Sequence, residues 1–323
     1  DAIMIENMGY IHALGRFDQY MYEFYKKDLE QGVSEQEIGD IIHEFKLRIE
    51  EMWYLRDEFE SGAYPGCALY IQMTLGGQKA DGTDACNDLT RLILHGMEDL
   101  QTKEPPVSFR YHDNVDEETF RLAINVALTG GSHPAFFNDN NSIPALINIG
   151  FTLEQARNWC LLGCTEPIVP GLSDYQSMLG FFNTIKVFEI TLYGGKDPVT
   201  GKQIGPETGN ARDFTSIEQL KEAYLTQQAY FIKRFVGKFN RMVSAHAYTM
   251  PTLLASAFTQ GCIEKGKLLQ DKGADYRWDA MATTGLGNIA DSFTAIEECV
   301  FNKKYLTMSE LMDALECDFK DKE

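Results

Sequence analysis

Residues 69–97 read LYIQMTLGGQKADGTDACNDLTRLILHGM, and three kinds of element follow one another in this stretch. Leu69–Leu75 is a short apolar run of the kind that forms a buried strand. The three glycines that come next predict a loop, because glycine supplies the backbone angles that tight turns need. Asp84 is then predicted to open a helix whose apolar residues recur on one face.

The same order of elements recurs twice toward the carboxyl end of the chain. Val107–Tyr111 predicts a second strand, and Asp116 is the predicted cap of the helix that follows it. Ala135–Phe137 predicts a third strand, ahead of a helix near Ile143–Ile149. Strand, loop and helix in repeated succession are typical of an α/β architecture. In such folds the chemistry lies in loops at the carboxyl ends of the strands.

The flanking regions are more helical. Ser34, Ser216 and Thr307 each precede a helical pattern and have Glu or Gln three residues later, which predicts a capped helix start. Residues 194–212 are rich in glycine and proline and predict one long surface loop. We therefore expect three segments: residues 1–60, mainly helical; residues 61–170, strand-loop-helix units that end in a cysteine-bearing loop; and residues 171–323, mainly helical.

Composition excludes several functional classes. The 323 residues carry 29 Lys and Arg against 48 Asp and Glu, which gives a formal net charge of −19. This acidic balance, without any basic run, argues against binding to nucleic acid or to anionic membranes. The apolar stretches stay short of the roughly 18 residues that a membrane-spanning helix requires. We expect an ordinary globular protein.

Cysteine and histidine are few and irregularly spaced. The seven cysteines predict no disulfide framework, because their number is odd and their spacing irregular. A reducing, cytoplasmic setting is therefore expected. No two of the six histidines have metal-ligand spacing, and Cys160 and Cys164 are four residues apart rather than three. The sequence predicts no metal site.

Gly163-Cys164-Thr165-Glu166-Pro167 is the most informative pentapeptide. A helix capped by Thr152 is predicted to end at Gly163, so Cys164 is expected in a loop. In an extended loop the thiol and the Glu166 carboxylate point to one side and can face one substrate. A helix C-terminus disfavours a thiolate, however, and no histidine lies within local reach to act as a base. From the residues alone, an ordinary loop cysteine is the commoner alternative.

Residues 156–167, ARNWCLLGCTEP, resemble the thiyl loop of the glycyl radical enzymes, the family of pyruvate formate-lyase and the radical diol dehydratases. Further short matches stand in the family's order over nearly the whole chain. They are GRFDQY at 15–20, LGGQ at 75–78 with DG at 81–82, PAFFND at 134–139 with IPAL at 143–146, GCIEKG at 261–266 and NIADS at 288–292. The resemblance implies a ten-stranded α/β barrel, present here in part, with helices outside and the cysteine on a central loop.

The G-C-x-E-P form resembles the eliminating and decarboxylating branch of that family, since pyruvate formate-lyase itself has two adjacent cysteines. The resemblance implies that Cys164 becomes a thiyl radical that takes a hydrogen atom from the substrate, and that Glu166 is the base. It also implies that His12 contacts the substrate, because the corresponding region lines the pocket of the diol dehydratases. A structural, hydrogen-bonded histidine is the alternative for His12. Asn138 and Asp139 are assigned to a turn and a helix cap.

The resemblance also implies a cofactor and partners. The family carries its radical on a glycine within an R-V-[SA]-G-Y-like motif of a C-terminal domain, and the 323 residues contain no such motif. We therefore expect the protein-derived glycyl radical outside this chain, no tightly bound cofactor, and no turnover by the chain alone. A radical SAM activating enzyme, a homodimer, a small-molecule substrate and an anaerobic setting are implied in the same way.

The function that the resemblance favours is a glycyl radical lyase that eliminates water, an amine or sulfite from a small hydroxylated substrate. An arylacetate-type glycyl radical decarboxylase and a pyruvate formate-lyase-like acyltransferase are the enzymatic alternatives. An inactive barrel scaffold is the alternative outside catalysis. The intact Cys164 and Glu166 favour an enzyme, whereas the missing radical motif favours the scaffold. The identity of the substrate depends on pocket side chains that the sequence does not reveal.

Overall fold

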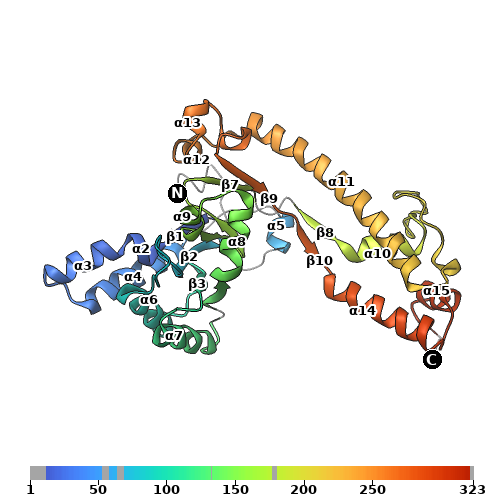
Figure 1. The fold of residues 1–323 in the computed structure, drawn as a ribbon, viewed down its shortest axis with the longest axis horizontal. Helices are drawn as coiled ribbons and strands as arrows, with labels where there is room; N and C mark the ends of the chain where they lie inside the picture. Colours follow the sequence, from blue (N-terminus) through green and yellow to red (C-terminus); the bar gives the residue numbers. More distant parts are fainter. Residues whose placement is uncertain (1–11, 53–57, 64–68, 132, 177–179, 321–323) are drawn as a thin grey trace. The chain divides into compact units, whose positions relative to one another are not determined.

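The computed structural model describes residues 12–52, 58–63, 69–131, 133–176 and 180–320 (Figure 1). The chain divides into two compact units, of which the first comprises Asp1–Tyr175 with Ala247–Trp278 and the second Gln176–His246 with Asp279–Glu323. The six cysteines within the described residues are free thiols. Cys67 lies outside the described residues.

Within the described part of the first unit, four parallel strands form a sheet in the order β1-β2-β3-β4. The strands are β1 (His12–Arg16), β2 (Ile71–Gly76), β3 (Val107–Tyr111) and β4 (Ala135–Asn138). Each is followed by a helix: α2 (Phe17–Tyr20), α6 (Asp88–Asp99), α7 (Glu117–Leu128) and α8 (Asp139–Ile149). The three predicted strand-loop-helix units are therefore confirmed, and one more strand precedes them.

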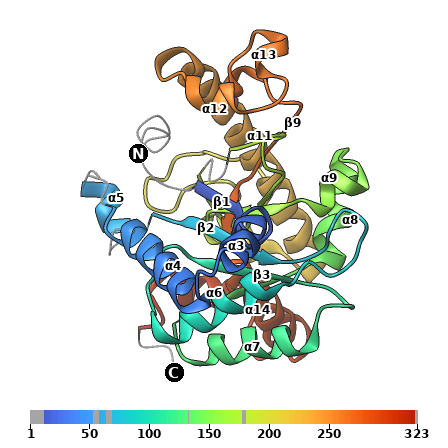
Figure 2. The same cartoon turned by 90° about the vertical axis from the view of Figure 1, so that its left-hand side faces the viewer.

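One face of the sheet is apolar and covered by helices. Met73, Leu75 and Phe109 are fully buried and pack against residues of α4 (Glu35–Glu50), α6 and α7. Figure 2 shows these helices lying over the strands, together with α3 (Tyr22–Glu30). We call this the outer face.

The other face of the sheet, here called the inner face, is polar. Side chains alternate along a strand, so Gln72, Thr74, Ser108 and Arg110 lie opposite the outer-face residues. All four are buried. Gln72 Nε2 donates to Ser108 Oγ across the two neighbouring strands at 2.7 Å. A buried polar face is built for directed hydrogen bonds rather than for apolar packing.

The predicted helix starts are confirmed at three places in the first unit. Ser34 Oγ accepts from Glu37 N, Asp116 accepts from Thr119 N, and Thr152 exchanges hydrogen bonds with the residue three positions on. These are local signals, and each depends only on residues within one turn.

The predicted opening of α6 at Asp84 is wrong, because the helix begins four residues later. Asn87 is the cap, and it exchanges hydrogen bonds with Thr90. The Asp84 carboxylate instead accepts from the backbone N–H of Asp116 at 2.8 Å and contacts His112 Nε2 at 3.2 Å. It therefore connects the loop after β2 to the loop after β3.

The helix predicted to end at Gly163 is shorter. This helix, α9 (Leu153–Arg157), ends six residues earlier. The chain then enters β5 (Cys160–Leu162), which pairs antiparallel with β6 (Glu166–Ile168). The short β7 (Ser173–Gln176) and β9 (Tyr276–Asp279) pair with each other further along. The remaining helices of this unit are α5 (Glu58–Ala63), α12 (Leu253–Ala257), α13 (Cys262–Lys265) and the short η2 (Leu269–Asp271).

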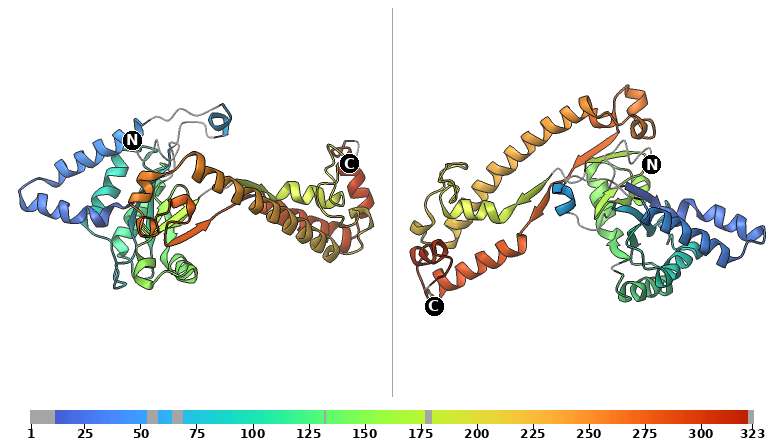
Figure 3. Two further views of the ribbon diagram at one scale, coloured as in Figure 1. Left: turned by 90° about the horizontal axis from the view of Figure 1, so that it is seen from above. Right: turned by 180° about the vertical axis from the view of Figure 1, so that it is seen from behind.

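The second unit is mainly helical in its described residues. Its elements are β8 (Phe181–Asn183) paired in parallel with β10 (Ala282–Thr284), α10 (Thr184–Leu192), η1 (Ala211–Asp213), most of α11 (Ile217–Thr249), α14 (Leu286–Ile296), the π-helix η3 (Glu297–Asn302) and α15 (Met308–Glu316). Helices α10 and α14 and most of α11 belong to this unit, whose ribbon is seen from two further sides in Figure 3. The rings of Phe188, Tyr224 and Phe293, one from each helix, meet edge to face.

The predicted caps of the second unit are also present. Ser216 Oγ accepts from Gln219 N at the start of α11, and Thr307 and Glu310 form a capping box at α15. Helix α11 continues ten residues beyond its predicted end at Phe239. Of the helices in the described ranges, none combines the length and the apolar character that crossing a membrane requires.

Candidate active site

Cys164 lies at the tip of the β5–β6 hairpin. Leu162 pairs with Glu166, so Gly163, Cys164 and Thr165 form the connection between the strands. Gly163 has φ 61°, in the left-handed region that glycine adopts without strain. The predicted loop position of Cys164 next to Glu166 is correct, but a hairpin supplies the loop and not a helix end.

The hairpin places a protonated thiol beside a carboxylate. The Cys164 residue is exposed, whereas Glu166 is buried, and Thr165 N donates to Glu166 Oε2 at 2.8 Å. Partial burial by the surrounding chain and, after it, the charge of Glu166 raise the pKa of the Cys164 thiol. The S–H bond is therefore kept at neutral pH, which suits a hydrogen-atom donor better than a nucleophile.

Cys160, four residues earlier, has a different environment. It is fully buried at the start of β5. Burial raises the pKa of its thiol to about 12, against the opposing influence of Arg110 and Arg16. A buried, protonated thiol of this kind is chemically inert toward solutes.

His12 is the first residue of β1, in the same unit as the hairpin. Its backbone N–H donates to Tyr70 O at 3.2 Å, and its side chain is half-buried. Strand β1 contacts β5, so His12 belongs to an element next to the cysteine-bearing hairpin. Its contact with a substrate remains a prediction.

Asn138 and Asp139 differ in their roles, although both were assigned to a turn and cap. Asn138 caps α8, since its Oδ1 accepts from Asn140 N. Asp139 is fully buried, and its carboxylate contacts Arg110 and Trp159. The signal that sequence reasoning missed is a charged residue placed directly after the carboxyl end of a strand.

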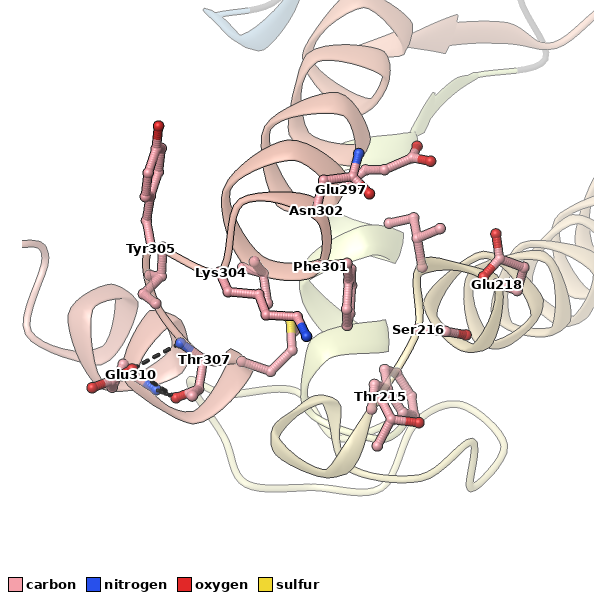
Figure 4. Close-up of a pocket in the computed structure, with 15 residues that line it drawn as sticks. Thr215, Ser216, Glu218, Glu297, Phe301, Asn302, Lys304, Tyr305, Thr307 and Glu310 are labelled. Atoms are coloured by element: carbon pink, nitrogen blue, oxygen red, sulfur yellow. Dashed lines mark hydrogen bonds between the residues drawn. The ribbon is translucent and has the colours of Figure 1, made fainter.

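Two other kinds of site, a metal centre and a cavity of the second unit, are the alternatives to the hairpin within the described residues. Over the part of the chain that is described, no three His, Cys, Asp or Glu residues gather closely enough to hold a metal ion. A cavity of about 590 Å³ in the second unit lies between the start of α11, η3 and α15. Figure 4 shows Phe301 and Lys304 at this cavity, with the Thr307–Glu310 hydrogen bonds at its edge. No cysteine or histidine lines it, so we assign the chemistry to the hairpin.

The similarity to known proteins agrees with this assignment. Residues 2–323 match the family described as Pyruvate formate lyase-like. The chain belongs to that family. Two curated proteins are each 31% identical to this chain. One is a (2S)-3-sulfopropanediol dehydratase of Klebsiella oxytoca, matched over 97% of this chain, and the other is a trans-4-hydroxy-L-proline dehydratase of Clostridioides difficile, matched over 95%. The chain spans only 38% of the length of the first of these dehydratases and 39% of the second.

Solved structures of the family share the fold. The glycerol-bound B12-independent glycerol dehydratase of Clostridium butyricum is 33% identical, with a TM-score of 0.90, over 96% of this chain and 39% of that one. A glycyl radical enzyme of Archaeoglobus fulgidus is 27% identical, with a TM-score of 0.91, over 98% of this chain and 41% of that one. The expected fold, part of a glycyl-radical-enzyme α/β barrel, is confirmed.

Proposed function

We propose that this chain is the cysteine-bearing central part of the barrel domain of a glycyl radical lyase. The observation that carries the proposal is the β5–β6 hairpin, which sets the protonated Cys164 thiol beside the buried Glu166 carboxylate. The dehydratase names among the similar proteins support a lyase, and an isethionate sulfite-lyase of Bilophila wadsworthia is 32% identical over 95% of this chain and 38% of that protein.

Cys164 and Glu166 would act one after the other in a single catalytic cycle. The Cys164 thiyl radical takes a hydrogen atom from a carbon of the substrate that bears a hydroxyl or amine, which restores S–H and leaves a carbon radical. Glu166 accepts the proton of that hydroxyl or amine. The adjacent carbon then releases its leaving group with the bonding electron pair. The product radical takes the hydrogen atom back from Cys164, and the thiyl radical is regenerated.

A glycyl radical on a glycine outside these 323 residues would supply the unpaired electron by taking the hydrogen atom of Cys164. The raised pKa of that thiol fits such a role, since a thiolate has no hydrogen atom to give. A separate radical SAM enzyme would generate the glycyl radical, and the protein would act as a homodimer on a small-molecule substrate. His12 would contact that substrate.

An arylacetate-type decarboxylase is the second candidate, because a 4-hydroxyphenylacetate decarboxylase glycyl radical subunit of Clostridium scatologenes is 26% identical over 94% of this chain and 36% of that protein. The two candidates use Glu166 differently. In a lyase it deprotonates the group next to the substrate radical, whereas in a decarboxylase it would manage the proton of the thiol.

The variant Glu166→Gln separates them in the activated, complete protein. For a lyase, elimination should fall by roughly 10²- to 10⁴-fold, the contribution of a positioned general base, while label still exchanges between substrate and Cys164. For a decarboxylase, exchange should fail together with turnover. Glu154→Gln, on the exposed side of α9, is the matched control. Full activity of Glu166→Gln on substrates of either class would reject both roles.

A further inference from the structure

Arg110 and Asp139 form a buried, two-point ion pair at the carboxyl edge of the sheet. Arg110 lies in β3 and Asp139 follows β4, so the parallel strands bring their ends together. Both side chains are fully buried. Arg110 Nε and Nη2 donate to Asp139 Oδ1 and Oδ2 at 2.8 and 2.9 Å. This parallel geometry is the strong, directional form of an arginine–carboxylate pair.

The same guanidinium also binds the backbone that leads into the β5–β6 hairpin. Arg110 Nη1 donates to Trp159 O at 2.6 Å, and Nη2 donates to Arg157 O at 3.0 Å. The guanidinium carbon lies 4.6 Å from the centre of the Trp159 ring. Trp159 Nε1 in turn donates to Asp139 Oδ1 at 2.9 Å. Residues 157–159 are therefore held on the ion pair through both backbone and side chain.

Two further side chains, Arg16 and Thr74, connect the neighbouring strands to this part of the chain. Arg16 of β1 donates to Arg157 O at 3.3 Å and to Gly76 O at 3.0 Å. Thr74 Oγ1 of β2 accepts from Leu161 N at 3.0 Å. Burial, and after it the proximity of Arg110, lower the pKa of Arg16 to about 10, so it stays charged at neutral pH. Strand β2 thus binds the hairpin itself, and strands β1 and β3 bind the residues just before it.

The glycine-bearing loop after β2 is shaped around these arginines. A Cβ atom on Gly77, whose φ is +83°, would lie 2.5 Å from Arg110 Cζ. A Cβ on Gly82 would lie 2.5 Å from Nη2 of Arg157. Neither distance is compatible with van der Waals contact. A side chain at Gly77 must therefore displace the Arg110 guanidinium.

We propose that Arg110 and Asp139 are positioning residues that fix the location of the cysteine-bearing hairpin. Stability alone does not account for the arrangement, because apolar residues often replace a buried ion pair without loss. Four polar contacts and a ring contact converge instead on two residues just ahead of Cys160, Arg157 and Trp159. The catalytic part of this proposal rests on the proposed function of Cys164. A displacement of about 1 Å in a reacting group lowers a rate by about 10²-fold.

Cys160 is a built-in reporter of hairpin docking, because it is fully buried at the start of β5. In the complete protein, Gly77→Ala should increase the rate of Cys160 alkylation by at least about tenfold. Gly32→Ala is the matched control: its φ is +88°, close to that of Gly77, but a Cβ there meets nothing within 4 Å. Equal Cys160 protection in both variants would overturn the proposal.

A second experiment addresses catalysis directly. In the activated enzyme, Asp139→Asn should lower kcat by about 10- to 100-fold with KM and glycyl radical content unchanged, and Trp159→Phe should have a smaller effect of the same kind. If Asp139→Asn does not fold, the double variant Arg110→Met/Asp139→Leu takes its place, since it removes both charges together. Unchanged kcat in a folded variant would overturn the positioning role.

The two proposals fail in different ways. If the wild-type protein shows no Cys164-dependent turnover while Gly77→Ala exposes Cys160, the proposed function is wrong and the anchoring of the hairpin stands. If Cys164 is essential for turnover while Cys160 stays protected and kcat stays unchanged in the anchor variants, the function stands and the anchor is wrong.

Discussion

The two faces of the four-stranded sheet are held by different forces. On the outer face, Met73 and Phe109 pack against helices through contacts that have little directional preference. On the inner face, Thr74 and Arg110 bind particular backbone atoms of the segment before Cys164. The outer face therefore sets how stable the unit is, whereas the inner face sets where the thiol lies.

The largest expected effect is a loss of turnover, and it concerns Cys164 at the tip of the hairpin that the inner face binds. Cys164→Ser should abolish turnover in the activated protein, because an O–H bond is too strong for the hydrogen-atom relay, while fold and glycyl radical content stay normal. Cys160→Ser is the control and should keep most of the activity. Product formation and the radical signal measure both. An active Cys164→Ser together with an inactive Cys160→Ser would show that the wrong cysteine has been assigned.

The outer face should respond in stability and not in position. Met73→Ala is expected to lower the free energy of unfolding by about 2–5 kcal/mol, the usual cost of truncating a fully buried large side chain. Urea titration measures this loss, and Met242→Ala on the exposed side of α11 should change it by less than about 0.5 kcal/mol. Cys160 should stay protected wherever Met73→Ala is folded. Faster alkylation of Cys160 in the folded Met73→Ala variant would contradict the proposed difference between the two faces.

Removal of the Thr74 hydroxyl from the inner face should loosen the hairpin locally, whereas truncation of Met73 should lower the stability of the whole unit. Thr74→Val keeps the shape of the side chain but leaves the buried Leu161 N–H without its acceptor, at a cost of about 1–3 kcal/mol. Hydrogen exchange at the Leu161 amide should accelerate more than exchange in β2 or β3. Thr283→Val, at an exposed position of β10, is the control. A uniform change over the whole sheet would contradict local anchoring.

The smallest expected effect is electrostatic and needs no turnover. Burial and, after it, the charge of Glu166 raise the pKa of the Cys164 thiol, so Glu166→Gln should lower that pKa part of the way toward its ordinary value. More thiolate is then present at any given pH below it, and alkylation of Cys164 should become several-fold faster near pH 8. The rate-against-pH curve should move to lower pH, and that of Glu154→Gln should not. A shift to higher pH would reverse the sign of the interaction.

The elements that sequence analysis located correctly depend on local chemistry. Ser34, Asp116 and Thr152 bind backbone N–H groups within one turn, and such pairs are visible in the order of residues. The cysteine motif was found because its five residues are contiguous. Its neighbourhood was described wrongly, because a helix was extended through residues that form β5.

The failures share a physical cause, which is a partner distant in sequence. Asp84 resembles a helix cap in the sequence. Its carboxylate instead accepts a hydrogen bond from the backbone N–H of Asp116, 32 positions further along the chain. Asp139 likewise resembles a cap residue until Arg110 of the preceding strand binds it. Residues 160–162 form a strand by pairing with residues 166–168, and within this strand Leu161 N also donates to Thr74 Oγ1, 87 positions back in the chain.

The anchoring of the hairpin also has a consequence for the order of folding. Its contacts with the first two strands span 87 residues from Thr74 to Leu161 and 141 from Arg16 to Arg157, more than the 59 that separate His12 of β1 from its partner Ile71 in β2. Contacts of such long range require large loops to close and form slowly compared with a helix or a local turn. We expect the sheet and its outer helices to assemble first and the hairpin to dock last. An unfinished chain would then not yet hold its reactive sulfur in place.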